Sequence, residues 1–265
     1  MPLSFFCGPG TLFLQQGLQT LGIVGGDVIH AQVDEVFHVR FLVHGPDVDF
    51  ETQIVRLLHP FGVFAEHLHR VVDAGNYTPK ETEALRGFIE EKGLRPVLAV
   101  NTHGHVDHML GVERVKELYG VPFALHPDDG FLIESAAVHG AMYGFRVEAV
   151  PTVERSLADG DEVAFGNTRL RVIHTPGHTP GHVCLYLPQE KILLTGDTLF
   201  RESIGRTDLP GGDYGWIMKS IIDRILPLGE EVTIYPGHGG ESTLGHEMLY
   251  NPFITEVMEG DVRPE

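Results

Sequence analysis

Three histidines and an aspartate crowd the segment NTHGHVDHMLG, residues 101–111, directly after the apolar run PVLAV. They are His103, His105, Asp107 and His108. Imidazole nitrogens and carboxylate oxygens are ligands for divalent cations such as Zn²⁺, Fe²⁺ and Mn²⁺. The segment therefore indicates a metal-binding loop at the end of a strand, although one such segment alone could also be a polar turn.

Three more apolar runs end in the same way. RLRVI leads to HTPGHTPGH with His178, KILLTG leads to Asp197, and EVTIYPG leads to His238. If these strands lie side by side, their carboxyl ends bring the ligands together at one rim. Seven candidates exceed the four ligands of one tetrahedral site and suit two ions that share a carboxylate. Of the flanking histidines, we expect His174 to pack or to support a ligand, while His182 could either hydrogen-bond a ligand or simply pack.

The elements that must position these residues form a mixed α/β pattern from Val71 onward. VVDAG predicts a strand that ends at Asp73, and TPKETEALRGFIEEKG predicts a helix with Thr78 and Glu81 as a capping box and Gly93 at its end. Further helices are expected over residues 108–120, within 128–145 and over 211–229, the last with Asp213 as its N-cap. Strands are expected over 96–101, 121–126, 161–166, 168–175, 182–188, 191–197 and 231–237.

Composition narrows the class of protein. The chain has 265 residues, a formal charge of −18 and two cysteines, Cys7 and Cys184. We expect one domain over residues 1–265, with 1–70 as an atypical part in which six histidines, His69 among them, lie at the surface or in edge strands. The negative charge disfavours nucleic acid as a partner. The absence of a membrane-length apolar run or an export signal predicts no membrane association and a cytoplasmic location, where a homo-oligomer is possible.

The motifs THGHVDH, TPGHTPGH, TGDTLF and YPGH, in this order, resemble the metallo-β-lactamase superfamily. Within it, the chain is most similar to the short bacterial members of the glyoxalase II (hydroxyacylglutathione hydrolase) group. The resemblance implies an α/β fold, a four-layer αββα sandwich, with the metal site at one edge of its two sheets. By position it implies His103, His105 and His178 at one ion, Asp107, His108 and His238 at the other, Asp197 as the bridge, and Asp73 as a brace for the metal loop.

The same resemblance implies the reaction. We expect hydrolysis of a small thioester such as S-lactoylglutathione by a hydroxide that bridges two divalent ions, zinc first, with iron or manganese as alternatives. Asp107 would accept a proton or orient the nucleophile. Arg206 matches a basic residue that contacts glutathione in the family, but Asp208 and Gly240 stand where its accompanying tyrosines are expected. Arg206 could instead pair with Asp208 or Asp213. We also expect Phe131, Met142 or Tyr143 to line the substrate pocket.

Two other functions fit parts of the pattern. A mononuclear iron oxygenase similar to persulfide dioxygenase would use His103, His178 and Asp197, and that family shares a GRTD stretch like Gly205 to Asp208. The apparently complete second ligand set argues against it. A purely structural metal is disfavoured because structural zinc sites are closed by thiolates, and no cysteine belongs to this set.

The N-terminal region does not show the plain hairpin that the family places before VVDAG.

Overall fold

The computed structural model describes the backbone of six strands between residues 19 and 58, and then residues 68–165 and 168–260. Side chains are described for residues 69–164 and 169–260. The six early strands are β1 (Gln19–Ile23), β2 (Asp27–Ala31), β3 (Val36–Arg40), β4 (Val43–Gly45), β5 (Val48–Phe50) and β6 (Ile54–Leu58). Of the six early histidines, only His69 has a described side chain.

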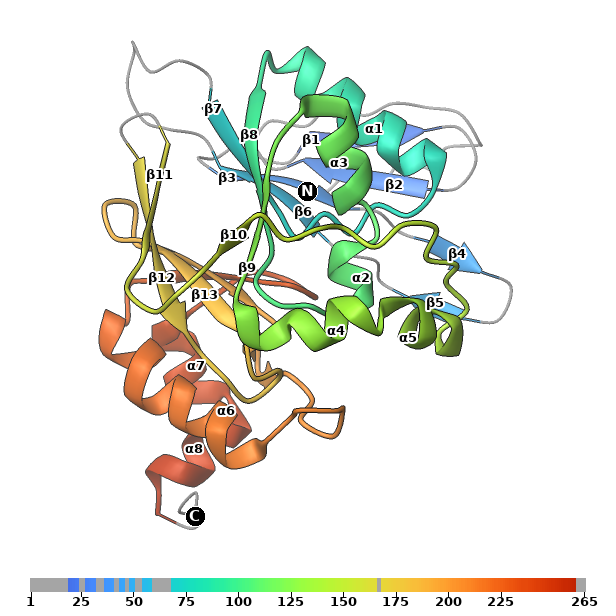
Figure 1. Cartoon of the computed structure of the whole chain (residues 1–265). Coiled ribbons are helices and arrows are strands. Elements are labelled where there is room, and N and C mark those ends of the chain that lie inside the picture. Colours follow the sequence, from blue (N-terminus) through green and yellow to red (C-terminus); the bar gives the residue numbers. More distant parts are fainter. Residues whose placement is uncertain are drawn as a thin grey trace.

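Two six-stranded sheets form the centre of the molecule (Figure 1). The first sheet has the order β10-β9-β8-β7-β6-β3. Strands β7 to β10 are parallel to one another, and β6 is antiparallel to both of its neighbours, β7 and β3. Its further strands are β7 (Leu68–Val72), β8 (Arg95–Val100), β9 (Phe123–Leu125) and β10 (Arg155–Ser156). The second sheet has the order β11-β12-β13-β14-β17-β18 and is antiparallel except between β14 and β17. Its strands are β11 (Glu162–Phe165), β12 (Thr168–His174), β13 (Val183–Leu187), β14 (Ile192–Gly196), β17 (Thr233–Pro236) and β18 (Ser242–Thr243).

The N-terminal strands correct two expectations. β6 pairs antiparallel with both β7 and β3, so strands do precede VVDAG, where the sequence showed no hairpin. The small β4–β5 pair separates β3 from β6, and the segment therefore lacks the short turn that marks a hairpin. His69 is fully buried rather than at the surface, because β7 is a central strand of the first sheet.

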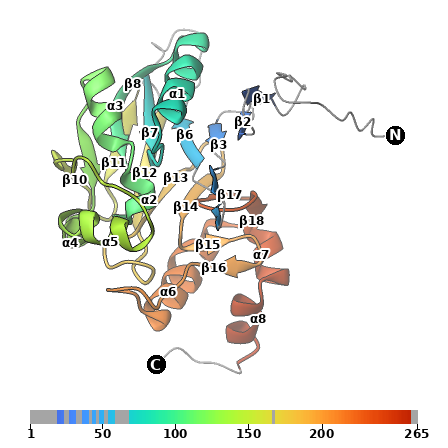
Figure 2. The ribbon, with the colours of Figure 1, turned by 90° about the vertical axis from the view of Figure 1, so that its right-hand side faces the viewer.

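Alternating side chains sort the core into three layers, as expected for strands whose residues point to opposite faces. Val71 and Ala99 face a cluster with helices α1 (Pro79–Glu91) and α3 (Val112–Tyr119), whereas Val72 and Leu98 face the second sheet. On the other side of the second sheet, apolar side chains pack against α6 (Tyr214–Ser220), η2 (Ile221–Ile225), α7 (Leu244–Tyr250) and α8 (Pro252–Met258). Figure 2 shows α1 and α3 at one end, α6 to α8 at the other, and the strands between them. The expected αββα sandwich is confirmed.

Local signals predicted the first helix well, but not the second. Thr78 and Glu81 form the capping box of α1, and Gly93 follows its end with a φ of 63°. The helix expected over 108–120 is two helices, α2 (Val106–Met109) and α3. Gly111 separates them, because its N–H donates to the Ala74 carbonyl and the Asn76 side chain fills the place of a Cβ. Within the described part of the chain, we find no helix both long and apolar enough to span a bilayer.

Candidate active site

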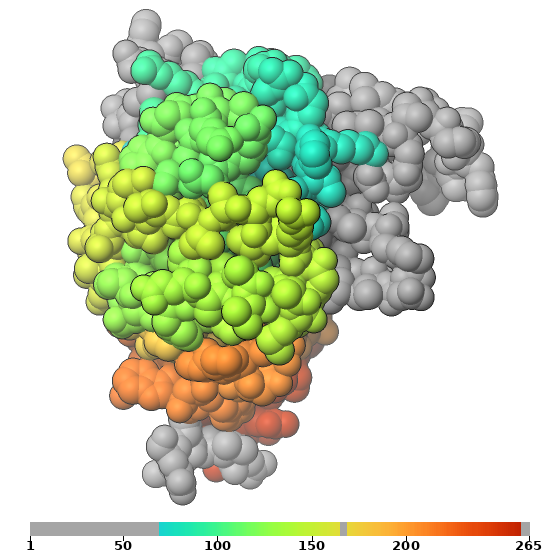
Figure 3. Space-filling view, turned by 45° about the vertical axis from the view of Figure 1, so that its right-hand side comes forward, coloured from blue at the N-terminus to red at the C-terminus, as the bar shows by residue number. Residues whose placement is uncertain are grey.

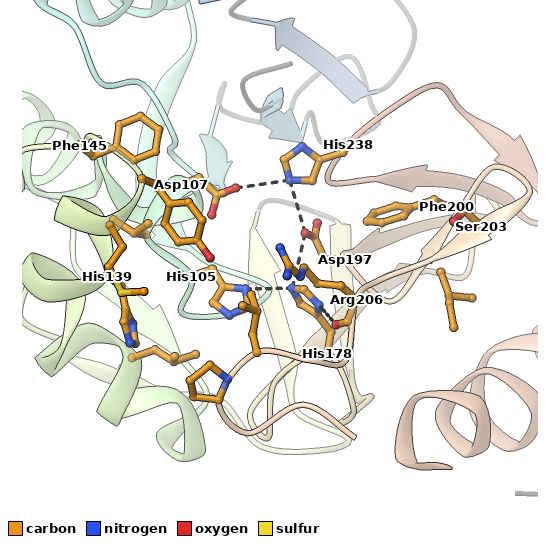
Figure 4. Close-up of a pocket in the computed structure, with 17 residues that line it drawn as sticks. His105, Asp107, His139, Phe145, His178, Asp197, Phe200, Ser203, Arg206 and His238 are labelled. Carbon is orange, nitrogen blue, oxygen red and sulfur yellow. Dashed lines mark hydrogen bonds and ion pairs between the residues drawn. The ribbon is translucent and has the colours of Figure 1, made fainter. Parts of the chain in front are cut away.

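Four strands deliver the predicted side chains to one rim of the sandwich, where the two sheets meet. The loop after β8 carries His103, His105, Asp107 and His108, the last two in the short helix α2. His178 follows β12, Asp197 follows β14, and His238 follows β17. In the close-up of Figure 4, His105, Asp107, His178, Asp197 and His238 point toward a common centre. The convergence expected from the strand ends is therefore present.

The seven side chains form two overlapping groups with Asp197 between them. Potential ligand atoms of His103, His105 and His178 lie within 4.8 Å of one another, as do those of Asp107, His108 and His238. The Oδ2 atom of Asp197 is 3.6 Å from Nε2 of His178 and 3.4 Å from Nε2 of His238. Its Oδ1 atom is 3.4 Å from Nε2 of His108. One carboxylate thus faces both groups.

Unsatisfied buried atoms indicate that these residues fit metal ions. Nε2 of His103, Nε2 of His108 and Oδ1 of Asp197 are buried and have no hydrogen-bond partner among the described residues. Leaving a buried polar atom unpaired costs about 1–3 kcal/mol, so such atoms are rare unless they serve another purpose. All three atoms lie within or between the two groups, where a cation could replace the missing hydrogen-bond partners.

The charges of the two groups differ. Burial, followed by the nearby His178, lowers the pKa of His105 to about 3, and burial also lowers the pKa of His103 and His178. Asp197 above all raises the pKa of His238 to about 11. Burial lowers the pKa of His108, but Asp197, Asp73 and Asp107 outweigh it and raise that pKa to about 10. The first group thus offers neutral imidazoles, while the second concentrates carboxylate charge that protons or cations must balance.

Two buried residues beneath the ligand candidates, Asp73 and His182, hydrogen-bond the loops that carry them. Asp73, with a φ of 51°, accepts hydrogen bonds from the backbone N–H of Thr102 at 2.7 Å and from its hydroxyl at 2.9 Å. Its Oδ2 atom also lies 3.4 Å from Nδ1 of His108. His182 is fully buried and its Nε2 accepts the N–H of Asp197 at 3.0 Å. His174 does not support a ligand directly. Its Nε2 donates to the Pro180 carbonyl at 2.8 Å.

A cavity of about 590 Å³ opens over the two groups. Met142 and Tyr143 line it, as expected, but Phe131 does not. The segment that carries α4 (Gly130–Glu134) and α5 (Ala136–Met142) borders the segment around residues 205–215 on this face (Figure 3). The remaining apolar lining residues are Val106, Leu132, Phe145, Phe200, Ile204, Leu209 and Pro210. The cavity therefore offers a mostly apolar environment beside a charged floor.

Arg206 reaches this cavity but is paired. Its Nε and Nη2 atoms each lie 2.7 Å from a carboxylate oxygen of Asp208, and its backbone carbonyl accepts the Nδ1 hydrogen of His178 at 2.7 Å. Of the two pairings considered from the sequence, the one with Asp208 is present.

Two buried supports were missed from the sequence. Asn101 donates from Nδ2 to the His108 carbonyl at 2.8 Å, and Asp129 contacts both histidine-bearing loops. Asn101 directly follows β8 and begins the ligand loop, a position that could have drawn attention to it. Asp129 follows Asp128 in a polar turn, and no feature of the sequence distinguishes the two.

Comparisons with known proteins agree with this geometry. The model of the metallo-beta-lactamase superfamily matches residues 66–246, so the chain belongs to that superfamily. The hydroxyacylglutathione hydrolase GloC of Haemophilus influenzae is 35% identical over 191 residues, which cover 69% of this chain and 86% of the relative. The fold and the clustered histidines and aspartates are those of a metal-binding, hydrolase-like enzyme.

Two solved structures are also similar. The B3 metallo-beta-lactamase BLEG-1 superposes with a TM-score of 0.71 at 32% identity, covering 83% of this chain and 99% of that one. The protein TTHA1623, solved in a di-iron-bound form, has a TM-score of 0.67 at 34% identity and covers 80% of this chain and 99% of its own.

Proposed function

We propose that this protein hydrolyses a small thioester with the help of two divalent metal ions. The observation that carries the proposal is the position of Asp197, whose carboxylate lies between two groups of three ligand candidates, within 3.6 Å of His178 in one and of His108 and His238 in the other, at the floor of an open cavity. His103, His105 and His178 would hold one ion, and Asp107, His108 and His238 would hold the other. Zinc is the first expectation, and iron is supported by the di-iron form of the similar protein TTHA1623.

The bound ions would supply an activated water and polarise the thioester carbonyl. The chain's own residues would orient these reactants. Asp107 lines the cavity and lies 3.5 Å from His238. Burial raises its pKa, but His108 and His238 outweigh burial and lower it to about 2, so this carboxylate is ionised at neutral pH and can accept a hydrogen bond or proton from water.

The leaving group fits a site without a strong acid. A thiol has a pKa of about 8.5, so the departing thiolate needs little protonation at neutral pH. Of the residues that line the cavity, Arg206 is the one Lys or Arg, and Asp208 already neutralises it. Hydrolysis of a thioester therefore needs no strong acid, and the described lining of the cavity offers no free Lys or Arg to act as one.

The name of one relative and the lining of the cavity support a choice of the first thioester to test. The resemblance to hydroxyacylglutathione hydrolase GloC supports S-lactoylglutathione as the first substrate to test. The apolar walls near Met142, Tyr143 and Phe200 would accommodate the carbon skeleton of a compact substrate. The persulfide dioxygenase alternative would use His103, His178 and Asp197 alone, and it leaves the convergence of Asp107, His108 and His238 without a role.

The direct experiment is turnover of S-lactoylglutathione and a panel of other thioesters by wild-type protein and by Asp197→Ala. We expect hydrolysis by the wild type and a loss of at least about 1000-fold in kcat/KM in the variant, because the substitution removes the carboxylate shared by both ion sites. Equal rates would refute the proposal. Oxygen uptake with glutathione persulfide on the same sample, with one iron per chain, would favour the dioxygenase instead.

A further inference from the structure

We propose that Asp129 is a positioning residue that locks together the two histidine loops of the metal centre. The first histidine loop is residues 101–108 and the second is residues 175–182. Asp129 ends the 3₁₀ turn η1 (Pro127–Asp129) after β9 and is fully buried. The inference rests on the proposed metal centre, but it concerns how the centre is held rather than which substrate it hydrolyses.

The Asp129 carboxylate accepts three hydrogen bonds from two distant parts of the chain. Its Oδ2 atom accepts the N–H of Gly104 in the first histidine loop at 2.8 Å and the hydroxyl of Thr179 in the second at 2.8 Å. Its Oδ1 atom accepts the N–H of Gly181 at 2.6 Å. Hydrogen bonds to a carboxylate are stronger than those between neutral groups, and here they join the loops of different sheets.

Both loops approach Asp129 closely at a glycine, and at Gly181 the space leaves no room for a Cβ. A Cβ on Gly181 would lie 2.7 Å from Oδ1 and from the backbone nitrogen of Asp129. A Cβ on Gly104 would lie 3.0 Å from the Asp129 carbonyl oxygen. The close approach of Asp129 accounts for Gly181 in the second TPGH and favours a small residue at Gly104 in HGH.

The residues that Asp129 fixes are neighbours of the first ligand group. Gly104 lies between His103 and His105, and Thr179 follows His178 directly. Nδ1 of His105 and Nε2 of His178 are 2.9 Å apart, so their spacing depends on the registration of the two loops. Asp73, by contrast, contacts Thr102 and His108. We infer that Asp129 holds the spacing of His105 and His178, whereas Asp73 supports His108 directly and His103 through the Thr102 hydroxyl.

A stacked histidine pair adds a second connection at the same place. The rings of His126 and His174 are 4.3 Å apart and nearly parallel, at 7°. His174 bonds the Pro180 carbonyl in the second histidine loop, and His126 begins the turn that carries Asp129. The stacked pair therefore packs the turn that carries Asp129 against the second histidine loop.

The test is Asp129→Asn, with the neighbouring Asp128→Asn as a matched control. An asparagine amide would place an NH₂ group against at least one of the N–H or O–H donors that now face the carboxylate. The side chain of Asp128 is 58% exposed and contacts neither histidine loop. Zn²⁺ and Co²⁺ affinities are measured by chelator competition on the full chain, and the spectrum of bound Co²⁺ reports changes in coordination at either ion site.

We expect Asp129→Asn to weaken one of the two ions by about 10- to 100-fold, the usual effect of removing a group that orients a metal ligand. The Co²⁺ spectrum should change, while Asp128→Asn should stay within about twofold of wild type. A folded Asp129→Asn protein that binds both ions with wild-type affinity, or loses both equally, would overturn the inference.

Thr179→Val provides a milder variant that keeps the shape of the side chain and removes one donor to Asp129. Its expected effect is a several-fold weakening of the same ion, and unchanged affinity would count against the inference even if Asp129→Asn failed to fold. Because these measurements need no thioester, two bound ions without thioester turnover would defeat the proposed substrate and leave the role of Asp129 standing.

Discussion

Nδ1 of His105 lies 2.9 Å from Nε2 of His178, although 73 residues separate the two histidines in the chain. One follows a strand of the first sheet and the other follows a strand of the second. Burial lowers the pKa of both imidazoles, so both are neutral at neutral pH and one donates to the other. The candidate centre therefore forms only when the two sheets pack against each other, so metal binding at the centre depends on that packing.

The brace at Asp73 can be tested separately from the ligands. Asp73→Asn keeps a residue that tolerates the left-handed backbone at φ 51°, but it loses the second carboxylate oxygen that faces the Thr102 hydroxyl and His108. We expect about 10- to 100-fold weaker binding of one ion, with the protein still folded. Isothermal titration of metal-free protein with Zn²⁺ measures this change. Asp223→Asn, at an exposed position away from the cavity, serves as the control, and equal affinities in the two variants would contradict the brace.

The pairing of Arg206 predicts how the protein treats charged substrates. The Arg206 side chain is neutralised by Asp208, whose pKa the hydrogen bond from Arg206 lowers to about 2. This carboxylate stays ionised as pH falls until about 2, so the pair persists across the range used for assays. We expect Asp208→Asn to release the guanidinium and to lower KM several-fold for a thioester with a carboxylate tail, with little change in kcat.

A neutral thioester is the internal control for this experiment, since its KM should not respond to Asp208→Asn. Arg206→Ala should have the opposite and smaller effect on the anionic substrate. If KM for both substrates moved together, the change would lie in the shape of the cavity and not in its charge.

Cys184 supplies a test of the second sheet. Burial raises its pKa to about 12, and hydrogen bonds involving Thr175 and Thr198 offset only part of that rise. A thiol whose pKa is raised by folding contributes stability below the pKa of the unfolded chain, about 8.5, and that contribution is lost as pH rises toward 12. We expect Cys184 to resist iodoacetamide at pH 8.5 in the native protein and to react in urea. Mass spectrometry of the peptide that contains Cys184 gives the two rates, and similar rates would show that the strand opens readily.

Local rules explain what the sequence could predict. The capping box of Thr78 and Glu81 acts within four residues, and the buried stripe of Leu85, Phe88 and Ile89 follows helical spacing. The ligand loops were visible because each begins where an apolar strand ends, and the side chains that metals prefer stand there in quick succession. Such features need no knowledge of the partner strands.

What escaped prediction depends on residues far apart in sequence. Asp128 and Asp129 look alike, but only Asp129 turns inward to meet Gly104, Thr179 and Gly181. Gly111 breaks a helix because the backbone of Ala74 and the side chain of Asn76 reach it across the fold. His69 is buried in β7, a central strand of the first sheet. These properties come from tertiary packing, which the spacing of apolar residues along the sequence does not reveal.

The central claim is that two cations occupy the two groups joined by Asp197, and metal content tests it most directly. Elemental analysis of purified wild type and Asp197→Asn should be combined with thioester turnover before chelation, after chelation and after metal is restored. The account predicts close to two ions per wild-type chain, one or none in the variant, and turnover that disappears and returns with the metal. Thioester turnover that persists in fully metal-free wild type, or a wild type that cannot take up a second ion, would contradict it.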